Sequence, residues 1–209
     1  MTEIFVSAFV TFFVVIDPPG CAPIFASLTA GGPPGFRRKM AIRSVLIAAA
    51  ILVFFALFGE QLLDALGITL AAFRIAGGIM LFLIALEMVF EKRTARRETR
   101  AQEINATPEI EDISVFPMAI PMIAGPGSIA SVMLLAARSD GPGESIAMFA
   151  ALAAALTVLL VALLAAGPLM RFLGHKVEAM ITRILGVILA ALAAQFVIDG
   201  IGVSFNVQA

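Results

Sequence analysis

The stretch IFVSAFVTFFVVIDPPGCAPIFASL, residues 4–28, decides the fold. It is apolar along nearly its whole length, yet Asp17 stands in its middle and is followed directly by Pro18, Pro19 and Gly20. Each proline lacks a backbone N–H and its ring clashes with the preceding turn, so a helix cannot run through this point unbroken. A carboxylate inside such an apolar stretch is costly unless it has a partner or a function. We therefore expect a broken membrane helix here, with Asp17 at the break.

The composition of the whole chain is that of a membrane protein. Of 209 residues, 61% are apolar and only 14% are charged, which is more apolar surface than a soluble domain of this length buries. Six apolar segments are each long enough to cross a hydrocarbon core of about 30 Å. These segments are residues 4–30, 40–58, 68–90, 113–137, 145–167 and 180–199. The sequence thus predicts an all-α membrane protein with six transmembrane helices.

Lys and Arg residues predict the orientation of these helices. Twelve of the 14 basic residues fall in alternate connections, and only Arg74 and Arg138 fall on the other side. The positive-inside rule places the twelve in the cytoplasm and both termini outside. The twelve are Arg37, Arg38, Lys39, Arg43, Lys92, Arg93, Arg96, Arg97, Arg100, Arg171, Lys176 and Arg183.

Residues 91–112 form the one long polar connection and divide the chain. We expect residues 91–100 to extend the third helix into water, residues 105–112 to act as a joint, and the charges to form a solvated face.

A second break, at residues 124–127 (AGPG), repeats the first. Its Pro-Gly pair follows the pair at residues 19–20 by 107 positions. Residues 73–77 (FRIAG) likewise match residues 182–186 (TRILG) at an offset of 109. Each half then holds one broken helix and two further helices, and an odd number of crossings gives the copies opposite orientations. The expected fold is two inverted three-helix repeats, with helices 1 and 4 broken at Pro/Gly. The repeats are residues 1–90 and 113–209, within one membrane domain.

In such a fold the two breaks meet near the middle of the membrane and form a substrate site. Half-helices that begin near Gly20 and Ser128 would point their N–H groups at a carboxylate. Asp17 and carbonyl groups freed by the prolines would accept an ammonium group. A small amino acid carries both charges. Two plainer interpretations stay open: the breaks only kink packed helices, and Asp17 only caps the next half-helix.

Other polar and small residues have weaker assignments. Asp199 is expected near the outer interface, with Gln195 one turn away. Ser131, like Ser128, follows the second break and could contact a ligand. Gly77, Gly78 and Gly186 are expected at close helix contacts. No nucleotide-binding loop is present in the sequence, so ATP-driven transport is not expected.

The chain resembles the MarC family of bacterial inner-membrane proteins, which includes neutral amino acid transporters of the SnatA type and is related to the LysE exporters. The resemblance covers nearly the whole chain and rests on residues 16–20 (IDPPG) with 23–25, on 77–90, on 119–121 with 124–126, and on 195–201. It implies a six-helix, multi-pass transporter of small neutral amino acids in the plasma membrane, coupled to a proton or another cation. One departure affects the site, since Cys21 stands where the family usually has Asn.

The sequence therefore predicts a secondary transporter rather than an enzyme, with no cofactor, metal or nucleic-acid partner and with lipid around it. The expected substrate-binding residues are Asp17, Pro18, Gly20, Cys21, Gly125, Pro126, Gly127 and Ser128. Three alternatives remain: an exporter of another small solute, an intramembrane aspartyl protease that uses Asp17 and Asp199, and a scaffold that transports nothing. A protease would need both carboxylates close enough to share a proton.

Overall fold

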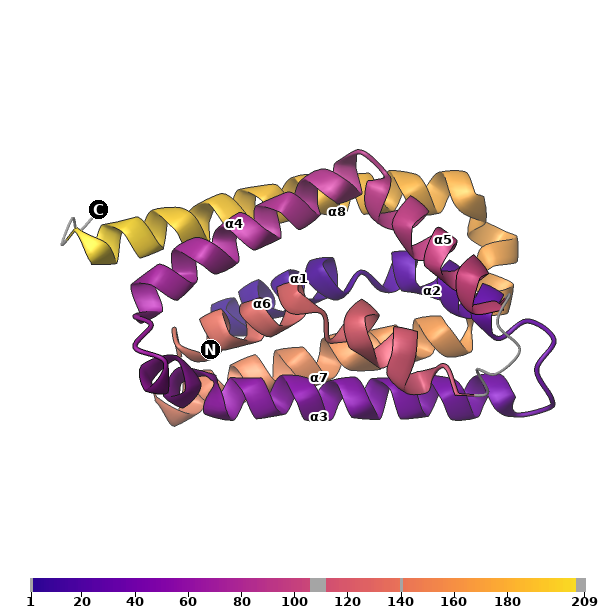
Figure 1. Cartoon of the computed structure of the whole chain (residues 1–209), viewed down its shortest axis with the longest axis horizontal. Coiled ribbons are helices and arrows are strands. Elements are labelled where there is room, and N and C mark those ends of the chain that lie inside the picture. Colours follow the sequence, from indigo (N-terminus) through magenta and orange to yellow (C-terminus); the bar gives the residue numbers. More distant parts are fainter. Residues whose placement is uncertain (1, 106–111, 140, 206–209) are drawn as a thin grey trace.

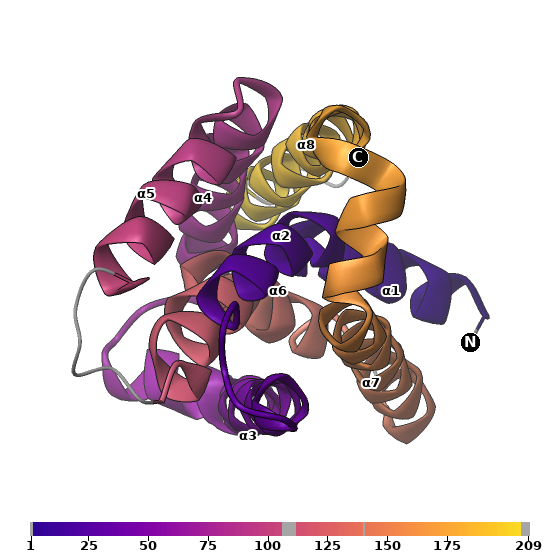
Figure 2. The same ribbon diagram turned by 90° about the vertical axis from the view of Figure 1, so that its right-hand side faces the viewer.

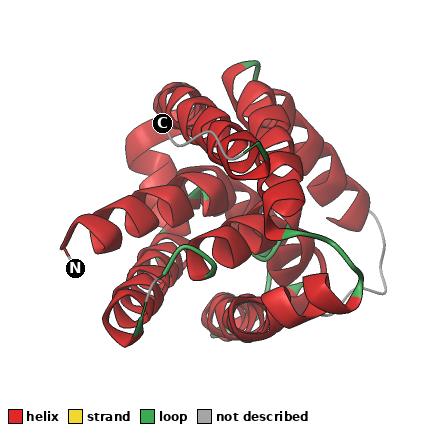
Figure 3. Cartoon of the chain, turned by 90° about the vertical axis from the view of Figure 1, so that its left-hand side faces the viewer, coloured by secondary structure: helices red, strands yellow, loops and turns green. Residues whose placement is uncertain are grey.

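The computed structural model describes residues 2–105, 112–139 and 141–205. Residues 106–111, in the predicted connection, and residues 206–209, at the end of the predicted second repeat, lie outside the described residues. Every regular element in the described part is a helix (Figure 3). The elements are α1 (Thr2–Ile16), α2 (Pro18–Leu28), α3 (Phe36–Ala65), α4 (Leu70–Val89), α5 (Lys92–Asn105), η1 (Ser114–Ile123), α6 (Pro126–Ala136), α7 (Pro142–Leu164) and α8 (Ala166–Ser204).

Length and apolar composition qualify five stretches in the described residues as membrane spans. A sixth is obtained if η1 and α6, which are bent by 55° relative to each other, count as one crossing. The five are Thr2–Leu28, Phe36–Ala65, Leu70–Val89, Pro142–Leu164 and Lys176–Ser204. The all-helical, multi-pass prediction is thus confirmed. The start of α1 and the end of α8 lie at the same end of the bundle, as an even number of crossings requires (Figures 1 and 3).

The interrupted segments lie in the middle of the bundle. Figure 1 shows α1 with α2, and η1 with α6, between the pair α4 and α8 on one side and the pair α3 and α7 on the other. Among these elements, α1 packs on α7, α3 packs on η1 and α6, and α4 packs along α8. Apolar side chains on the outer helices are exposed: Phe58 is 53%, Leu83 56% and Val187 61% exposed. A lipid environment suits such faces.

Small residues bring α4 and α8 into close contact. A Cβ atom added to Gly78 would lie 2.8 Å from the backbone oxygen of Ala193, and one added to Gly186 would lie 3.1 Å from the backbone oxygen of Ala85. Backbones can approach this closely only where side chains are absent or small. The predicted role of Gly78 and Gly186 in helix packing is confirmed. Gly77 instead faces α6, where an added Cβ would lie 3.0 Å from Leu134.

The helix after α4 does not run where the sequence predicted. We expected residues 91–100 to continue the third helix into water, and that expectation is wrong. The chain turns at Phe90 and Glu91, where Glu91 has a left-handed φ of 58°, and α5 then folds back against α2 and α4 (Figure 1). The physical reason lies in the arginines of α5, which find acceptors inside the bundle.

Candidate functional site

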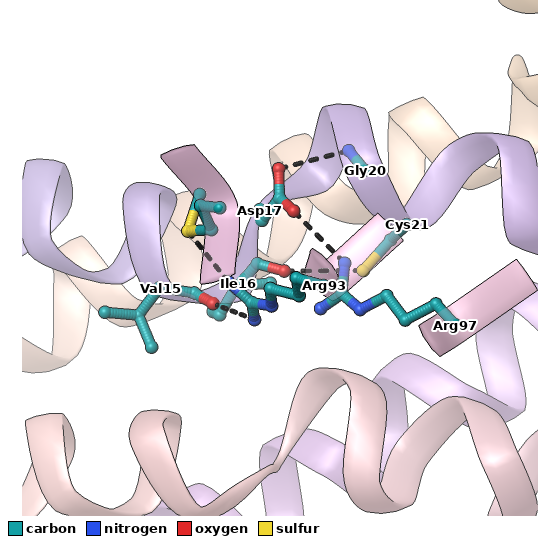
Figure 4. A network of polar contacts seen from close by, with 8 residues as sticks. Val15, Ile16, Asp17, Gly20, Cys21, Arg93 and Arg97 are labelled. Atoms are coloured by element: carbon teal, nitrogen blue, oxygen red, sulfur yellow. Dashed lines mark hydrogen bonds and ion pairs between the residues drawn. The ribbon is translucent and has the colours of Figure 1, made fainter. Parts of the chain in front are cut away.

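The first break is closed by hydrogen bonds from its own neighbourhood. Helix α1 ends at Ile16, Asp17 adopts a left-handed conformation with φ 59° and ψ 65°, and α2 starts at Pro18. Asp17 is 1% exposed. Its Oδ1 accepts a hydrogen bond from the backbone N–H of Gly20 at 3.1 Å, so the carboxylate caps α2. Figure 4 shows this carboxylate between Gly20 and Arg97.

An arginine from α5 neutralises the buried acid. Arg97 Nη1 lies 3.1 Å from Asp17 Oδ2, and the side chain of Arg97 is only 10% exposed. A buried carboxylate needs such a partner, because an isolated charge in an apolar interior costs several kcal/mol. Asp17 therefore has the partner that its position demands.

Arg93, one turn before Arg97, satisfies a backbone group that the prolines leave open. In an unbroken helix the carbonyl of Val15 would accept from residue 19, but Pro19 has no N–H. Arg93 Nη2 donates to this carbonyl at 2.9 Å (Figure 4). Burial and the neighbouring Arg97 cation lower the pKa of Arg93 to about 10, which leaves the guanidinium charged at neutral pH.

The remaining residues of the first break also belong to this network. The buried Cys21 thiol donates to the carbonyl of Ile16 at 3.3 Å (Figure 4). Gly20 leaves room for the capping acid, since an added Cβ would lie 2.2 Å from Asp17 Oδ2. Pro18 begins α2. The four residues predicted at this break, Asp17, Pro18, Gly20 and Cys21, do not line the cavity described next.

The second break opens onto a cavity of about 300 Å³. Helix α6 begins at Pro126 after Gly125, which has an extended backbone and, unlike Asp17, no side-chain cap. All four residues predicted at this break line the cavity. The full lining is Val15, Ile84, Glu87, Arg93, Arg96, Arg97, Pro117, Pro121, Met122, Gly125, Pro126, Gly127 and Ser128.

Positive charge dominates the cavity. The first turn of a helix has N–H groups without intrahelical partners and a partly positive potential, and here it is the first turn of α6. Three arginines, Arg93, Arg96 and Arg97, line the same space against one acid, Glu87. Glu87 Oε1 pairs with Arg96 Nη2 at 2.8 Å. The arrangement suits a carboxylate or another small anion.

Sequence reasoning missed the residues of α5 and α4 at this site. Arg93 and Arg97 were assigned to a solvated face, and Glu87 was not among the expected site residues. One signal was available, because Arg93 and Arg97 are four residues apart and so lie on the same face of a helix.

Asp199, the second acid of the protease alternative, belongs to a different cluster. It lies 3.3 Å from Arg138 and accepts a hydrogen bond from Gln195 at 2.7 Å. Arg138 also stands over the ring of Phe196, 5.8 Å from its centroid. Each acid thus has its own arginine, and Asp17 and Asp199 do not form one carboxyl pair.

Known proteins similar to this chain are membrane proteins. Residues 2–205 match the family described as "MarC family integral membrane protein". The UPF0056 membrane protein MJ1677 of Methanocaldococcus jannaschii is 38% identical over 199 residues, which cover 95% of this chain and 96% of that protein. The UPF0056 inner membrane protein YhgN of Escherichia coli is 34% identical, over 96% of this chain and 97% of that protein. The UPF0056 membrane protein YvbG of Bacillus subtilis is 33% identical, over 99% and 98%.

No solved structure matches the chain. Because the family match and these relatives cover almost its full length, the chain belongs to the MarC family of integral membrane proteins.

Proposed function

We propose that this protein is a secondary transporter of small neutral amino acids, and that the substrate binds in the cavity at the second break. The observation that carries the proposal is the joint presence of an uncapped helix start at Gly125–Pro126 and the guanidinium groups of Arg93 and Arg97 around one cavity. The substrate carboxylate would lie on the N–H groups of α6, beside these two cations.

The ammonium group needs an acceptor, and Glu87 is the acid that lines the cavity. The sequence had assigned this role to Asp17, whose oxygens are held by Gly20 and Arg97. We therefore assign the ammonium group to Glu87, which would exchange its contact with Arg96 for one with the substrate. Asp17 keeps an indirect role, because it positions Arg97.

The size of the cavity favours a small side chain. Its volume of about 300 Å³ lies at the lower end of the range of small-molecule sites. Val15, Ile84 and Met122 provide apolar walls on which a methyl group can rest. Alanine, glycine and serine fit these properties better than a large or charged amino acid.

The packing of the helices supports the inverted repeat that such a transporter would use. The proposed repeat relates α1 and α2 to η1 and α6, α3 to α7, and α4 to α8. If it holds, the main contacts must have counterparts. Helix α1 packs on α7 while η1 packs on α3, α2 packs on α8 while α6 packs on α4, and α4 packs on its own equivalent α8. This reciprocal pattern is what a two-fold axis in the membrane plane produces.

Counterflow of labelled alanine into proteoliposomes that contain the purified protein tests the proposal. We expect saturable exchange that unlabelled glycine and serine inhibit strongly, that leucine inhibits weakly, and that a panel of drugs leaves unchanged. If the protein exchanges no amino acid under conditions where it is folded and inserted, the proposed function is wrong.

The excess of positive charge favours one alternative, a transporter of small monocarboxylates. Acetate and lactate carry the carboxylate but lack the ammonium group. Stronger inhibition of counterflow by lactate than by alanine would favour this alternative and remove the assigned role of Glu87.

A further inference from the structure

A second, wider cavity of about 640 Å³ lies between α5 and α8. On one side its charged lining residues are Glu91, in the turn before α5, and Glu98, in α5. On the other side they come from α8 and are Lys176, Glu178 and Arg183. It shares no lining residue with the cavity at the second break. Figure 2 shows the end of the bundle where α5 and the beginning of α8 lie.

Glu178 is the unusual residue of this cavity. It is 4% exposed, and its Oε1 has no hydrogen-bond partner among the described residues. An ionised carboxylate in such a place is costly, and a buried group of this kind avoids the cost by taking up a proton. Glu98, from the facing helix, is exposed and carries no such cost.

The charges around Glu178 connect it to the first break. The charged groups near Glu178 are Asp17 from the α1–α2 link, Glu98 and Arg97 from α5, and Glu91. Arg183, on its own helix, is engaged with Glu91 at 2.7 Å, and Lys176 lies at the start of the same stretch of α8. Arg97 is thus the cation shared by three places: Asp17, the surroundings of Glu178 and the substrate cavity.

We propose that Glu178 binds the proton that accompanies the substrate, and that Arg97 couples the two binding events. This inference rests on the proposed transport function. The proton comes from water in the α5–α8 cavity, is carried on a carboxyl oxygen of Glu178, and returns to water when the cycle releases it.

The sign of the coupling follows from competition for Arg97. When Glu178 is ionised, it adds a second carboxylate that attracts Arg97 away from the substrate cavity. When Glu178 is protonated, Arg97 stays with Asp17 and faces the substrate carboxylate. Proton and substrate therefore favour each other's binding and move together. By linkage, each raises the affinity for the other by the same factor, which is about 5- to 150-fold in typical coupled systems.

The test compares two modes of alanine transport in proteoliposomes. One is uptake driven by an imposed pH gradient, and the other is counterflow without a gradient. In the parent protein, uptake should follow the gradient, and counterflow should be faster at acidic pH than at neutral pH. Glu178→Gln, which keeps the shape of the protonated group, should lower gradient-driven uptake about tenfold. Its counterflow should persist without dependence on pH.

Two control variants separate proton binding from a local disturbance. Glu98→Gln removes an exposed acid of the same cavity, and Thr182→Val alters a buried polar residue one turn after Glu178. Both should keep gradient-driven uptake and its pH dependence. A loss of coupling in either control as large as in Glu178→Gln would overturn the assignment to Glu178.

A spectroscopic measurement completes the test without requiring transport. The infrared spectrum of the parent protein should contain a protonated carboxyl band that disappears on titration to alkaline pH. This band should be missing in Glu178→Gln and present in Glu98→Gln. A band that Glu178→Gln leaves unchanged, or gradient-driven uptake that it retains, overturns the inference alone. Failure of the parent to exchange any amino acid overturns the proposed function as well.

Discussion

The two breaks have similar Pro-Gly sequences but different surroundings in the structure. At the first, Asp17 caps α2, Arg93 takes the carbonyl freed by Pro19, and Arg97 neutralises the acid. At the second, Gly125 provides no side-chain cap and the start of α6 faces a cavity. One break is closed by side chains of the protein itself. The other leaves its helix start open for a ligand.

Substitutions at the two breaks should therefore affect different properties of the protein. A substitution at the first should mainly lower the stability of the fold, because it leaves buried charges or carbonyls without partners. A substitution at the second should mainly change transport. The predictions below run from the largest expected effect to the smallest.

Arg97→Gln should have the largest effect, a loss of about 3–5 kcal/mol in the free energy of unfolding, because it leaves Asp17 buried without a counter-ion. Unfolding of the purified protein in detergent measures it. Arg96→Gln is the matched control, since its pair with Glu87 leaves the Arg96 side chain 71% exposed and is worth about 0–1 kcal/mol. In the double variant Asp17→Asn/Arg97→Gln, the loss should be smaller than the sum of the two single losses. Equal losses in Arg97→Gln and Arg96→Gln would contradict the closed first break.

Gly20→Ala should cost about 1–3 kcal/mol of stability, as overpacking typically does, since the new Cβ would displace the capping carboxylate. Gly127→Ala is its counterpart at the second break. There the new Cβ would lie 2.6 Å from Ile84 Cδ1, the end of a side chain that can move. The same unfolding measurement should show the smaller loss for Gly127→Ala, while alanine counterflow should fall more in Gly127→Ala than in Gly20→Ala. The reverse order in both measurements would contradict the assignment of the first break to stability and of the second to transport.

The sequence predicted the elements that depend on local chemistry. Pro18 and Pro19 interrupt a helix in any surroundings, and Gly125, Pro126 and Gly127 mark the second break in the same way. Membrane class follows from composition alone. The capping role of Asp17 was also visible, as one of two interpretations, because acids favour helix starts.

The ion-pair partner of Asp17 could not be predicted in the same way, since it comes from a distant segment. Arg97 is 80 residues after Asp17, and nothing local shows that α5 turns back at Glu91. A run of charges normally stays in water. Here two arginines of α5 leave water, because each finds an acceptor inside the bundle. Arg93 donates to the carbonyl of Val15, which has no donor within its own helix, and Arg97 donates to the buried carboxylate of Asp17. Buried acceptors without local donors are therefore the signal by which such contacts can be sought in a sequence.

Ser128→Ala tests the open break with a smaller effect. Ser128 lines the cavity, and the loss of one hydrogen bond to substrate, about 0.5–1.5 kcal/mol, corresponds to a two- to tenfold weaker apparent affinity. The concentration dependence of alanine counterflow gives this number. Ser131→Ala is the matched control, because Ser131 is buried on the same helix, has an unpartnered hydroxyl and does not line the cavity. Equal weakening of the apparent affinity in both variants would contradict the proposal that the substrate binds in this cavity.

Asp199→Asn should have the smallest effect, although Asp199 and Asp17 both pair with an arginine. The side chains of Asp199 and Arg138 are 23% and 47% exposed, and a pair this accessible to solvent contributes about 0–1 kcal/mol. Gln195 can donate to the new amide oxygen as it does to the carboxylate. We therefore expect nearly unchanged unfolding and counterflow in Asp199→Asn, against clear losses in Asp17→Asn. Equal losses of activity in the two variants would instead indicate that the acids act together, as the protease alternative requires.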